Sequence, residues 1–101
     1  MRTFSEKVMA DARKNSCIRC GSEVGVYGRH YNGLRQHRLG KGRGIKCHGM
    51  AVADFCAVCD KAFQEGSTRK DDLVARTNYS EEFLFWCMMS QIRRIDNGVI
   101  S

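Results

Sequence analysis

Two cysteine pairs of the form Cys-x-x-Cys constrain this chain more than any other feature of its sequence. Cys17 and Cys20 form the first pair, and Cys56 and Cys59 form the second. Thiolates at this spacing can occupy one edge of a metal tetrahedron, so two pairs complete the closed four-ligand site of structural zinc. A chain of 101 residues has a marginal core, which a bound metal commonly supplements. The spacing therefore predicts a structural Zn²⁺ held by these four cysteines.

The cellular compartment decides whether the six cysteines bind metal or form disulfides. The N-terminal sequence MRTFSEKVMADARKN interleaves hydrophobic and charged residues and lacks the apolar run of a signal peptide. No stretch approaches the roughly 20 apolar residues of a membrane span. We therefore expect a soluble, cytoplasmic protein with no membrane role, whose thiols stay reduced. A thioredoxin-type redox pair would need a βαβ context that the sequence lacks.

Two further cysteines remain outside these pairs. Cys87 lies among apolar residues and is expected to be a small buried hydrophobe. Cys47 is followed by His48, and the two could contribute to a second metal site. The role of Cys47 is left open by the sequence.

The charge of the chain favours a polyanionic partner. Seventeen Lys and Arg against eleven Asp and Glu leave a net charge of +6. Residues 29–46 contain no carboxylate, and their basic or titratable side chains are Arg29, His30, Arg35, His37, Arg38, Lys41, Arg43 and Lys46. Solvated loops usually mix both signs of charge, whereas phosphate-binding segments do not. We expect this basic segment (residues 29–46) to bind DNA, or RNA, and a solvated surface loop is the alternative.

Hydrophobic periodicity predicts one α+β domain over residues 1–101, with no repeat and no linker. The expected elements before the second cysteine pair are a helix over 4–14 with Ser5 as N-cap, a strand over 23–30, a glycine-containing loop over 31–46 and an extended stretch over 50–55. A short helix is expected from Asp60 to Gly66.

The last predicted helix spans residues 79–97, with Asn78 or Ser80 as its N-cap and Gly98 at its end. Arg93 and Arg94 suit the negative end of its dipole. Its apolar stripe consists of Phe83, Leu84, Trp86, Cys87, Met88, Ile92 and Ile95. A stripe this wide is either core or, in part, a homodimer contact.

The order of these features resembles the zinc treble clef of HNH, or His-Me finger, nucleases. The resemblance rests on Cys17-x2-Cys20, a strand that ends at Arg29-His30, a long loop, and Cys56-x2-Cys59 opening a helix. Within that superfamily, His30, the turn GRGIK (residues 42–46) and FCAVC (residues 55–59) resemble small prophage-encoded nucleases of the YbcO type. The tail RTNYSEEFLFWCMMSQIRRIDNGVI resembles the ending of the same family. The resemblance implies a zinc-bound treble-clef, or ββα-metal, core over residues 17–66 with flanking helices.

The resemblance also implies a metal-dependent DNA endonuclease of phage or prophage type, acting in recombination or repair. His30 would activate water, since the unperturbed pKa of a histidine side chain lies near neutrality. The family carries a histidine where this chain has Asp60, so Asp60 and His48 are the candidate ligands of a catalytic Mg²⁺ or Mn²⁺, with His37 a third. Lys46 and Arg43 would hold phosphates.

Each of these roles has a simpler alternative. His30 could cap a strand or contact phosphate without chemistry, and Asp60 could be favoured by the helix dipole alone. The competing function is a non-catalytic zinc module that binds DNA or a recombination protein through the same basic segment.

Overall fold

The computed structural model of the chain describes residues 3–39, 48–67 and 71–100. Within these ranges the elements are α1 (Phe4–Ala12), β1 (Tyr27–His30), the 3-10 helix η1 (Gln36–Leu39), β2 (Val52–Phe55), α2 (Ala57–Ser67) and α3 (Leu73–Asp96). The predicted α+β class is thereby confirmed. The predictions for Lys41, Arg43, Lys46 and Cys47 fall outside the described residues.

Helix α1 begins at Phe4, the predicted first residue, but its N-cap lies two residues before the predicted Ser5. The Thr3 hydroxyl oxygen accepts a hydrogen bond from the backbone N–H of Glu6 at 3.2 Å, which makes Thr3 the N-cap. The prediction of Ser5 was therefore wrong, because Ser5 already lies inside the helix. The helix ends at Ala12, earlier than the expected residue 14.

Helix α3 is longer than the sequence predicted. Its N-cap is Asp72, whose carboxylate accepts the backbone N–H of Ala75 at 3.0 Å. The predicted caps Asn78 and Ser80 lie within the helix, so the boundary at residue 79 was wrong. The predicted end is confirmed, since Gly98 adopts a φ of +73° just beyond the helix.

Strands β1 and β2 form an antiparallel pair in which Tyr27 faces Phe55 and His30 faces Val52. Strand β1 is shorter than the expected 23–30, because Gly25 has a φ of +66° and interrupts the extended chain. Helix α2 begins at Ala57 and not at Asp60. The first helical turn therefore contains Cys59, and the N–H of Asp60 donates to the Cys56 carbonyl at 2.9 Å.

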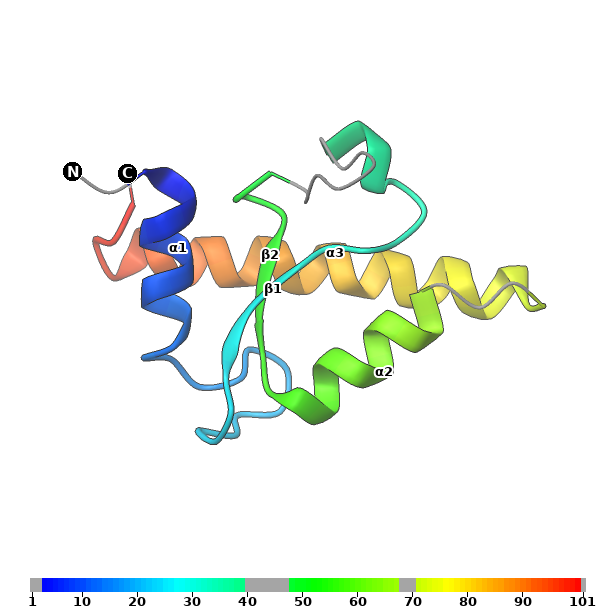
Figure 1. The fold of residues 1–101 in the computed structure, drawn as a ribbon, viewed down its shortest axis with the longest axis horizontal. Coiled ribbons are helices and arrows are strands. Elements are labelled where there is room, and N and C mark those ends of the chain that lie inside the picture. The colour runs from blue at the N-terminus through cyan, green and yellow to red at the C-terminus, as the bar shows by residue number, and fades with distance from the viewer. Residues whose placement is uncertain (1–2, 40–47, 68–70, 101) are drawn as a thin grey trace.

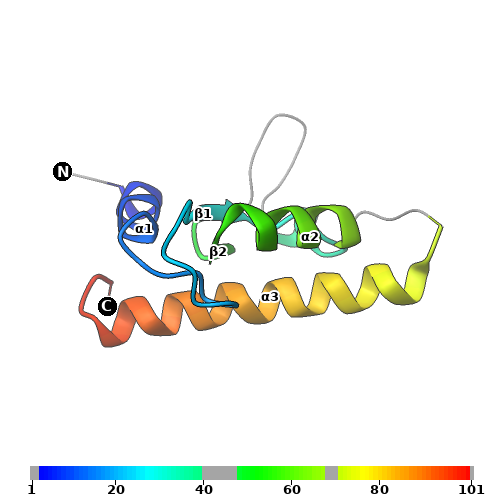
Figure 2. The ribbon, with the colours of Figure 1, turned by 90° about the horizontal axis from the view of Figure 1, so that it is seen from below.

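The molecule has two layers (Figures 1 and 2). Figure 2 shows α3 along one side, with α1, the β1–β2 hairpin and α2 along the other. Aromatic rings join these layers: Phe55 stacks on Phe63 of α2 with centroids 5.1 Å apart, and Phe83 of α3 lies 5.3 Å from Phe55. Cys87 is buried beside this core, as predicted.

A buried ionic network ties the hairpin to the C-terminal end of α3. Asp54 and Arg94 are both fully buried and form an ion pair. Arg93 donates to the second oxygen of Asp54 at 2.8 Å, and Asp11 of α1 lies 3.3 Å from Arg94 Nε. Arg93 and Arg94 thus act mainly as partners of Asp54, a role that goes beyond the expected interaction with the helix dipole.

Candidate metal centre and nucleic-acid interface

The two cysteine pairs meet at one point of the fold. Cys17 and Cys20 lie in the turn that precedes β1, and Cys56 and Cys59 lie at the start of α2. All four sulfur atoms lie within 4.8 Å of one another. The Sγ atoms of Cys20 and Cys56 are 3.7 Å apart, too far for a disulfide, and the four residues are free thiols. The predicted association of the two pairs is confirmed, and the cluster could hold a metal ion such as zinc.

Local backbone bonds shape the first pair. The N–H of Gly21 donates to the Cys17 carbonyl at 2.9 Å, and the N–H of Cys17 donates to the Ser22 carbonyl at 2.7 Å. Gly21 has a φ of +81°, which favours glycine at this position. The N–H of Ile18 donates to the Asp54 carbonyl at 2.8 Å and so attaches this turn to β2.

The metal-free cluster holds thiols of very different acidity. Burial opposes ionisation of Cys17, but backbone N–H groups of Cys20, Cys56 and Arg19 outweigh it and lower the pKa of Cys17 to about 7. Burial raises the pKa of Cys59 to about 12; the Arg19 guanidinium opposes this rise and the neighbouring thiols add to it. Crowded thiols therefore resist joint ionisation, and a divalent cation would favour all four thiolates. Three of the four are buried, as suits a closed structural site.

His30 lies at the end of β1, where the sequence placed it. Its backbone carbonyl accepts a hydrogen bond from Gln64 of α2 at 3.4 Å, and Gln64 also donates to Asp60 at 3.4 Å. Arg29 forms an ion pair with Asp60 at 3.6 Å. The side chains of Arg29 and Gln64 thus contact Asp60, and Gln64 also contacts the His30 backbone. No motif in the sequence marked Gln64.

His48 belongs to a different part of the surface. Its Nδ1 accepts the backbone N–H of Met50 at 3.1 Å, and its ring lies 6.0 Å from that of Phe4. Among the described residues, the four cysteines are the only set of three or more His, Cys, Asp or Glu side chains that lie close enough together to hold one metal ion. The assignment of Asp60 and His48 to a catalytic cation stays a prediction.

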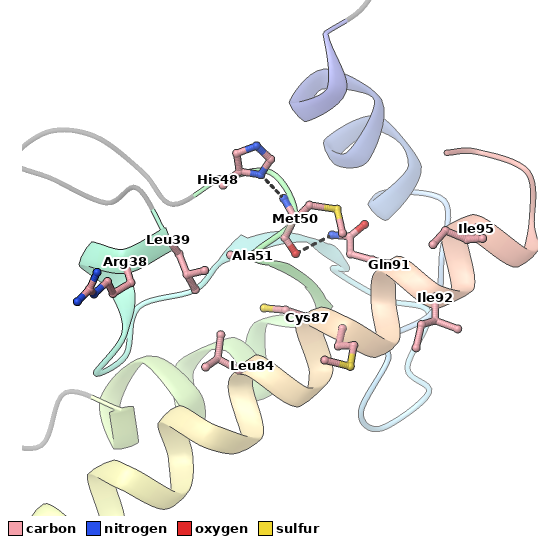
Figure 3. A pocket seen from close by; sticks show the side chains of 11 residues that line it. Arg38, Leu39, His48, Met50, Ala51, Leu84, Cys87, Gln91, Ile92 and Ile95 are labelled. Carbon is pink, nitrogen blue, oxygen red and sulfur yellow. Dashed lines mark hydrogen bonds between the residues drawn. The ribbon is translucent and has the colours of Figure 1, made fainter. Parts of the chain in front are cut away.

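An apolar groove of about 920 Å³ lies beside His48 (Figure 3). One wall is the face of α3 that carries Leu84, Cys87, Met88, Ile92 and Ile95; the other is formed by Arg38, Leu39, His48, Met50 and Ala51. The predicted stripe on α3 is therefore divided. Phe83 and Cys87 face the core, whereas Met88 is 63% exposed.

The basic segment is described only in part. Arg29 is half-buried, and the Arg35 and Arg38 side chains are exposed. The backbone N–H of Arg35 donates to the Tyr31 hydroxyl at 3.1 Å, which anchors the start of the segment to the core. His37 lies in η1. Nucleic-acid binding by these residues stays a prediction.

In the described ranges, no helix has both the length and the apolar character needed to cross a membrane. The chain matches no protein-family model, no curated protein and no solved structure.

Proposed function

We propose that this chain is a zinc-stabilised DNA endonuclease of the HNH, or His-Me finger, type, with a treble-clef core over residues 17–66. The observation that carries the proposal is the cysteine cluster, which joins the turn before β1 to the first turn of α2. The hairpin between them ends its first strand at His30. Turn, hairpin and helix therefore follow one another in the order that the resemblance implies.

Zinc is the metal that best suits the cysteine cluster. Four thiolates in a tetrahedral, closed set are the ligands of structural Zn²⁺, and no position remains for a substrate. Its proposed role is to hold β1, and with it His30, against α2. Chelation would then remove both the fold and the activity.

The proposed chemistry is hydrolysis of a phosphodiester bond. His30 would accept a proton from the attacking water, because a neutral imidazole is available at physiological pH. Exposed Arg35 and Arg38, together with Lys41, Arg43 and Lys46, would hold the DNA backbone through charge-assisted hydrogen bonds. A Mg²⁺ or Mn²⁺, with Asp60 or, as the alternative, His48 as a proposed ligand, would supply charge stabilisation at the scissile phosphate. Both Asp60 oxygens already have protein partners, so a cation at Asp60 would displace Arg29 or Gln64.

Cleavage of supercoiled plasmid tests the proposal. Wild-type protein with Mn²⁺ or Mg²⁺ should nick or linearise the DNA, and His30→Ala should reduce the rate by about 100-fold or more. Asp60→Asn should raise the cation concentration needed for half-maximal cleavage, with Asp96→Asn as the matched control on an exposed helical position. Equal cleavage by wild type and His30→Ala, each with its full zinc content, would exclude His30 as the base. The nuclease proposal fails if the wild-type protein leaves the DNA intact both with Mn²⁺ and with Mg²⁺.

A second candidate function is a non-catalytic zinc module that binds DNA. It is favoured by the ion pair between Arg29 and Asp60, which engages the carboxylate proposed as a cation ligand. This module would bind DNA through the basic segment alone, and the affinity for DNA should fall steeply as the salt concentration rises.

Gel shifts over a salt series separate binding from cleavage. Arg35→Gln combined with Arg38→Gln should weaken DNA binding and flatten the salt slope by about two, because each lost phosphate contact removes about one unit. The single change Arg13→Gln, at an exposed position on α1's C-terminal end, is the matched control. A salt slope unchanged in the double variant would contradict the assigned interface. A shifted but uncut plasmid would favour the second candidate function.

Phage or prophage origin, a cytoplasmic location and a recombination partner belong to the same proposal. Origin and recombination partner follow from the resemblance alone, whereas the cytoplasmic location stays a prediction from the sequence.

A further inference from the structure

Arg19 connects the two cysteine pairs. It lies between Cys17 and Cys20 in the sequence, yet its Nη1 donates to the Sγ of Cys59, in the other pair, at 3.6 Å. The contact therefore spans the cluster from the first turn to α2. A hydrogen bond to a sulfur ligand is the usual role of residues that surround a metal site.

The other side of the same guanidinium faces α2 and α3. Its carbon lies 5.0 Å from the centre of the Phe63 ring, and its Nε lies 3.5 Å from the Glu82 carboxylate. The planar fork of arginine can serve a sulfur and a carboxylate at once, whereas the ammonium of lysine acts as a single point charge. The indole N–H of Trp86 donates to the same Glu82 oxygen at 3.0 Å. A continuous chain of contacts therefore runs from Cys59 through Arg19 and Glu82 to Trp86.

Charge gives Arg19 a specific role once a metal is bound. Four thiolates around one divalent cation carry an excess of negative charge, which N–H donors to sulfur partly offset. Arg19 and Glu82 are each partly exposed, with side chains 40% and 45% accessible. An ion pair this exposed contributes little to the free energy of folding. The main effect of Arg19 should therefore appear at the metal.

We propose that Arg19 is a positioning residue of the metal centre. It donates to the Cys59 thiolate, offsets the charge of the four-thiolate site, and links that site to α3 through Glu82. The inference rests on the zinc site proposed above.

Zinc release into an excess of a chromogenic chelator tests this role. Arg19→Gln should release zinc about 10 to 100 times faster than wild type, because loss of an outer hydrogen bond weakens metal binding by that order. Arg19→Lys keeps the charge but not the fork, so its release rate should lie between the two. Glu82→Gln should accelerate release less than Arg19→Gln, since the bond to Cys59 remains. Arg13→Gln, an exposed arginine in α1's C-cap region, is the matched control and should release zinc at the wild-type rate.

A cobalt-substituted sample supplies a readout that a merely structural role would not change. The sulfur-to-cobalt charge-transfer bands depend on hydrogen bonds to the thiolates, so they should shift in Arg19→Gln and stay in place in Glu82→Gln and Arg13→Gln. Unchanged bands together with a wild-type release rate in Arg19→Gln would overturn the inference and leave the zinc proposal intact. Wild-type protein that contains no zinc and binds no cobalt would instead overturn the zinc proposal. If Arg19→Gln does not fold, the comparison of Arg19→Lys with Glu82→Gln still decides, because the first should alter the bands and the second should not.

Discussion

Asp54 connects several elements of the fold. Its carboxylate is fully buried and binds Arg94 and Arg93 of α3, while Asn15, beyond α1, donates to it at 3.3 Å. Its backbone N–H donates to Ser90 at 3.1 Å, and its carbonyl accepts from Ile18 in the first cysteine turn. One position of β2 thus connects α3, the chain just after α1 and the first cysteine turn.

Neutralising Asp54 should therefore be severe. Asp54→Asn leaves Arg94 buried with only part of its countercharge, and breaking a buried pair in this way costs about 3 to 5 kcal/mol. The free energy of unfolding, measured by urea titration of the zinc-loaded protein, should fall by that amount. Asp96→Asn, at an exposed position, should change it by less than about 0.5 kcal/mol. Similar values for the two variants would mean that the network does not hold the fold.

The acidity of Cys17 has a consequence for metal binding. With a pKa of about 7, this thiol is mostly protonated at pH 6 and mostly ionised at pH 8 in the metal-free protein. A ligand that is already ionised releases no proton when the metal binds. The number of protons released per zinc should thus fall by up to about one between pH 6 and pH 8. Cys59, with a pKa of about 12, should release its proton throughout this range.

Calorimetric titration with zinc in buffers of different ionisation enthalpy measures this number. Cys17→Ser should remove the change between the two pH values, at the expense of affinity. A constant proton release over the range in wild type would mean that Cys17 is not the acidic thiol of the cluster.

At the scale of elements, α3 shows how a single cap sets a boundary. Asp72 starts the helix ahead of the predicted caps Asn78 and Ser80, because its carboxylate accepts the backbone N–H of Ala75. The added residues 73–78 lead into Tyr79, which lay inside the predicted helix as well and whose ring lies 5.7 Å from that of Phe63 of α2.

Loss of this cap should cost about 1 kcal/mol. Asp72→Ala removes the acceptor for Ala75, whereas Asp72→Ser replaces it with another good capping group. Thermal unfolding of the loaded protein should show a lower midpoint for Asp72→Ala and a value near wild type for Asp72→Ser. Equal midpoints for the alanine and serine variants would place the start of the helix elsewhere.

At the scale of the whole molecule, the exposed half of the α3 stripe is the feature that a homodimer would use. Met88, Ile92 and Ile95 line the groove shown in Figure 3, and all three remain exposed in one chain. The dimer expected from the sequence would bury them against a second copy. The net charge of +6 opposes this association, so it should strengthen as salt is added.

Sedimentation velocity over a range of protein and salt concentrations tests the dimer. Ile92→Glu should shift the distribution to monomer, because it places a charge in the apolar interface. Val58→Glu is the matched control, since Val58 of α2 is 78% exposed and lies outside the groove. A monomeric wild type, or dissociation by both variants alike, would contradict a contact through this face.

The cysteine cluster was the part of the site that could be predicted best. The two-residue spacing within each pair brings its sulfurs together locally, so only the meeting of the two pairs required the fold. Burial of Cys87 and Phe83 was also readable, because helical periodicity marks a core face. The position of His30 at the end of a strand was also predicted from a local pattern, the alternation of residues along that strand.

The remaining features depend on contacts between residues far apart in the chain. In the sequence, Arg19 is indistinguishable from a surface cation, and only the fold places it beside Cys59. The sequence likewise marks Arg93 and Arg94 only as the end of a helix, whereas the fold pairs both with Asp54. Gly25 set the start of β1 through a single backbone torsion, and Asp72 set the start of α3 through a single hydrogen bond. By itself, then, the sequence determined which residues can bind metal and which helical face is apolar, because both depend on local spacing. Tertiary structure alone decided which charges are buried, which half of the α3 stripe is covered and which side chains surround the metal centre, because these depend on how distant segments pack.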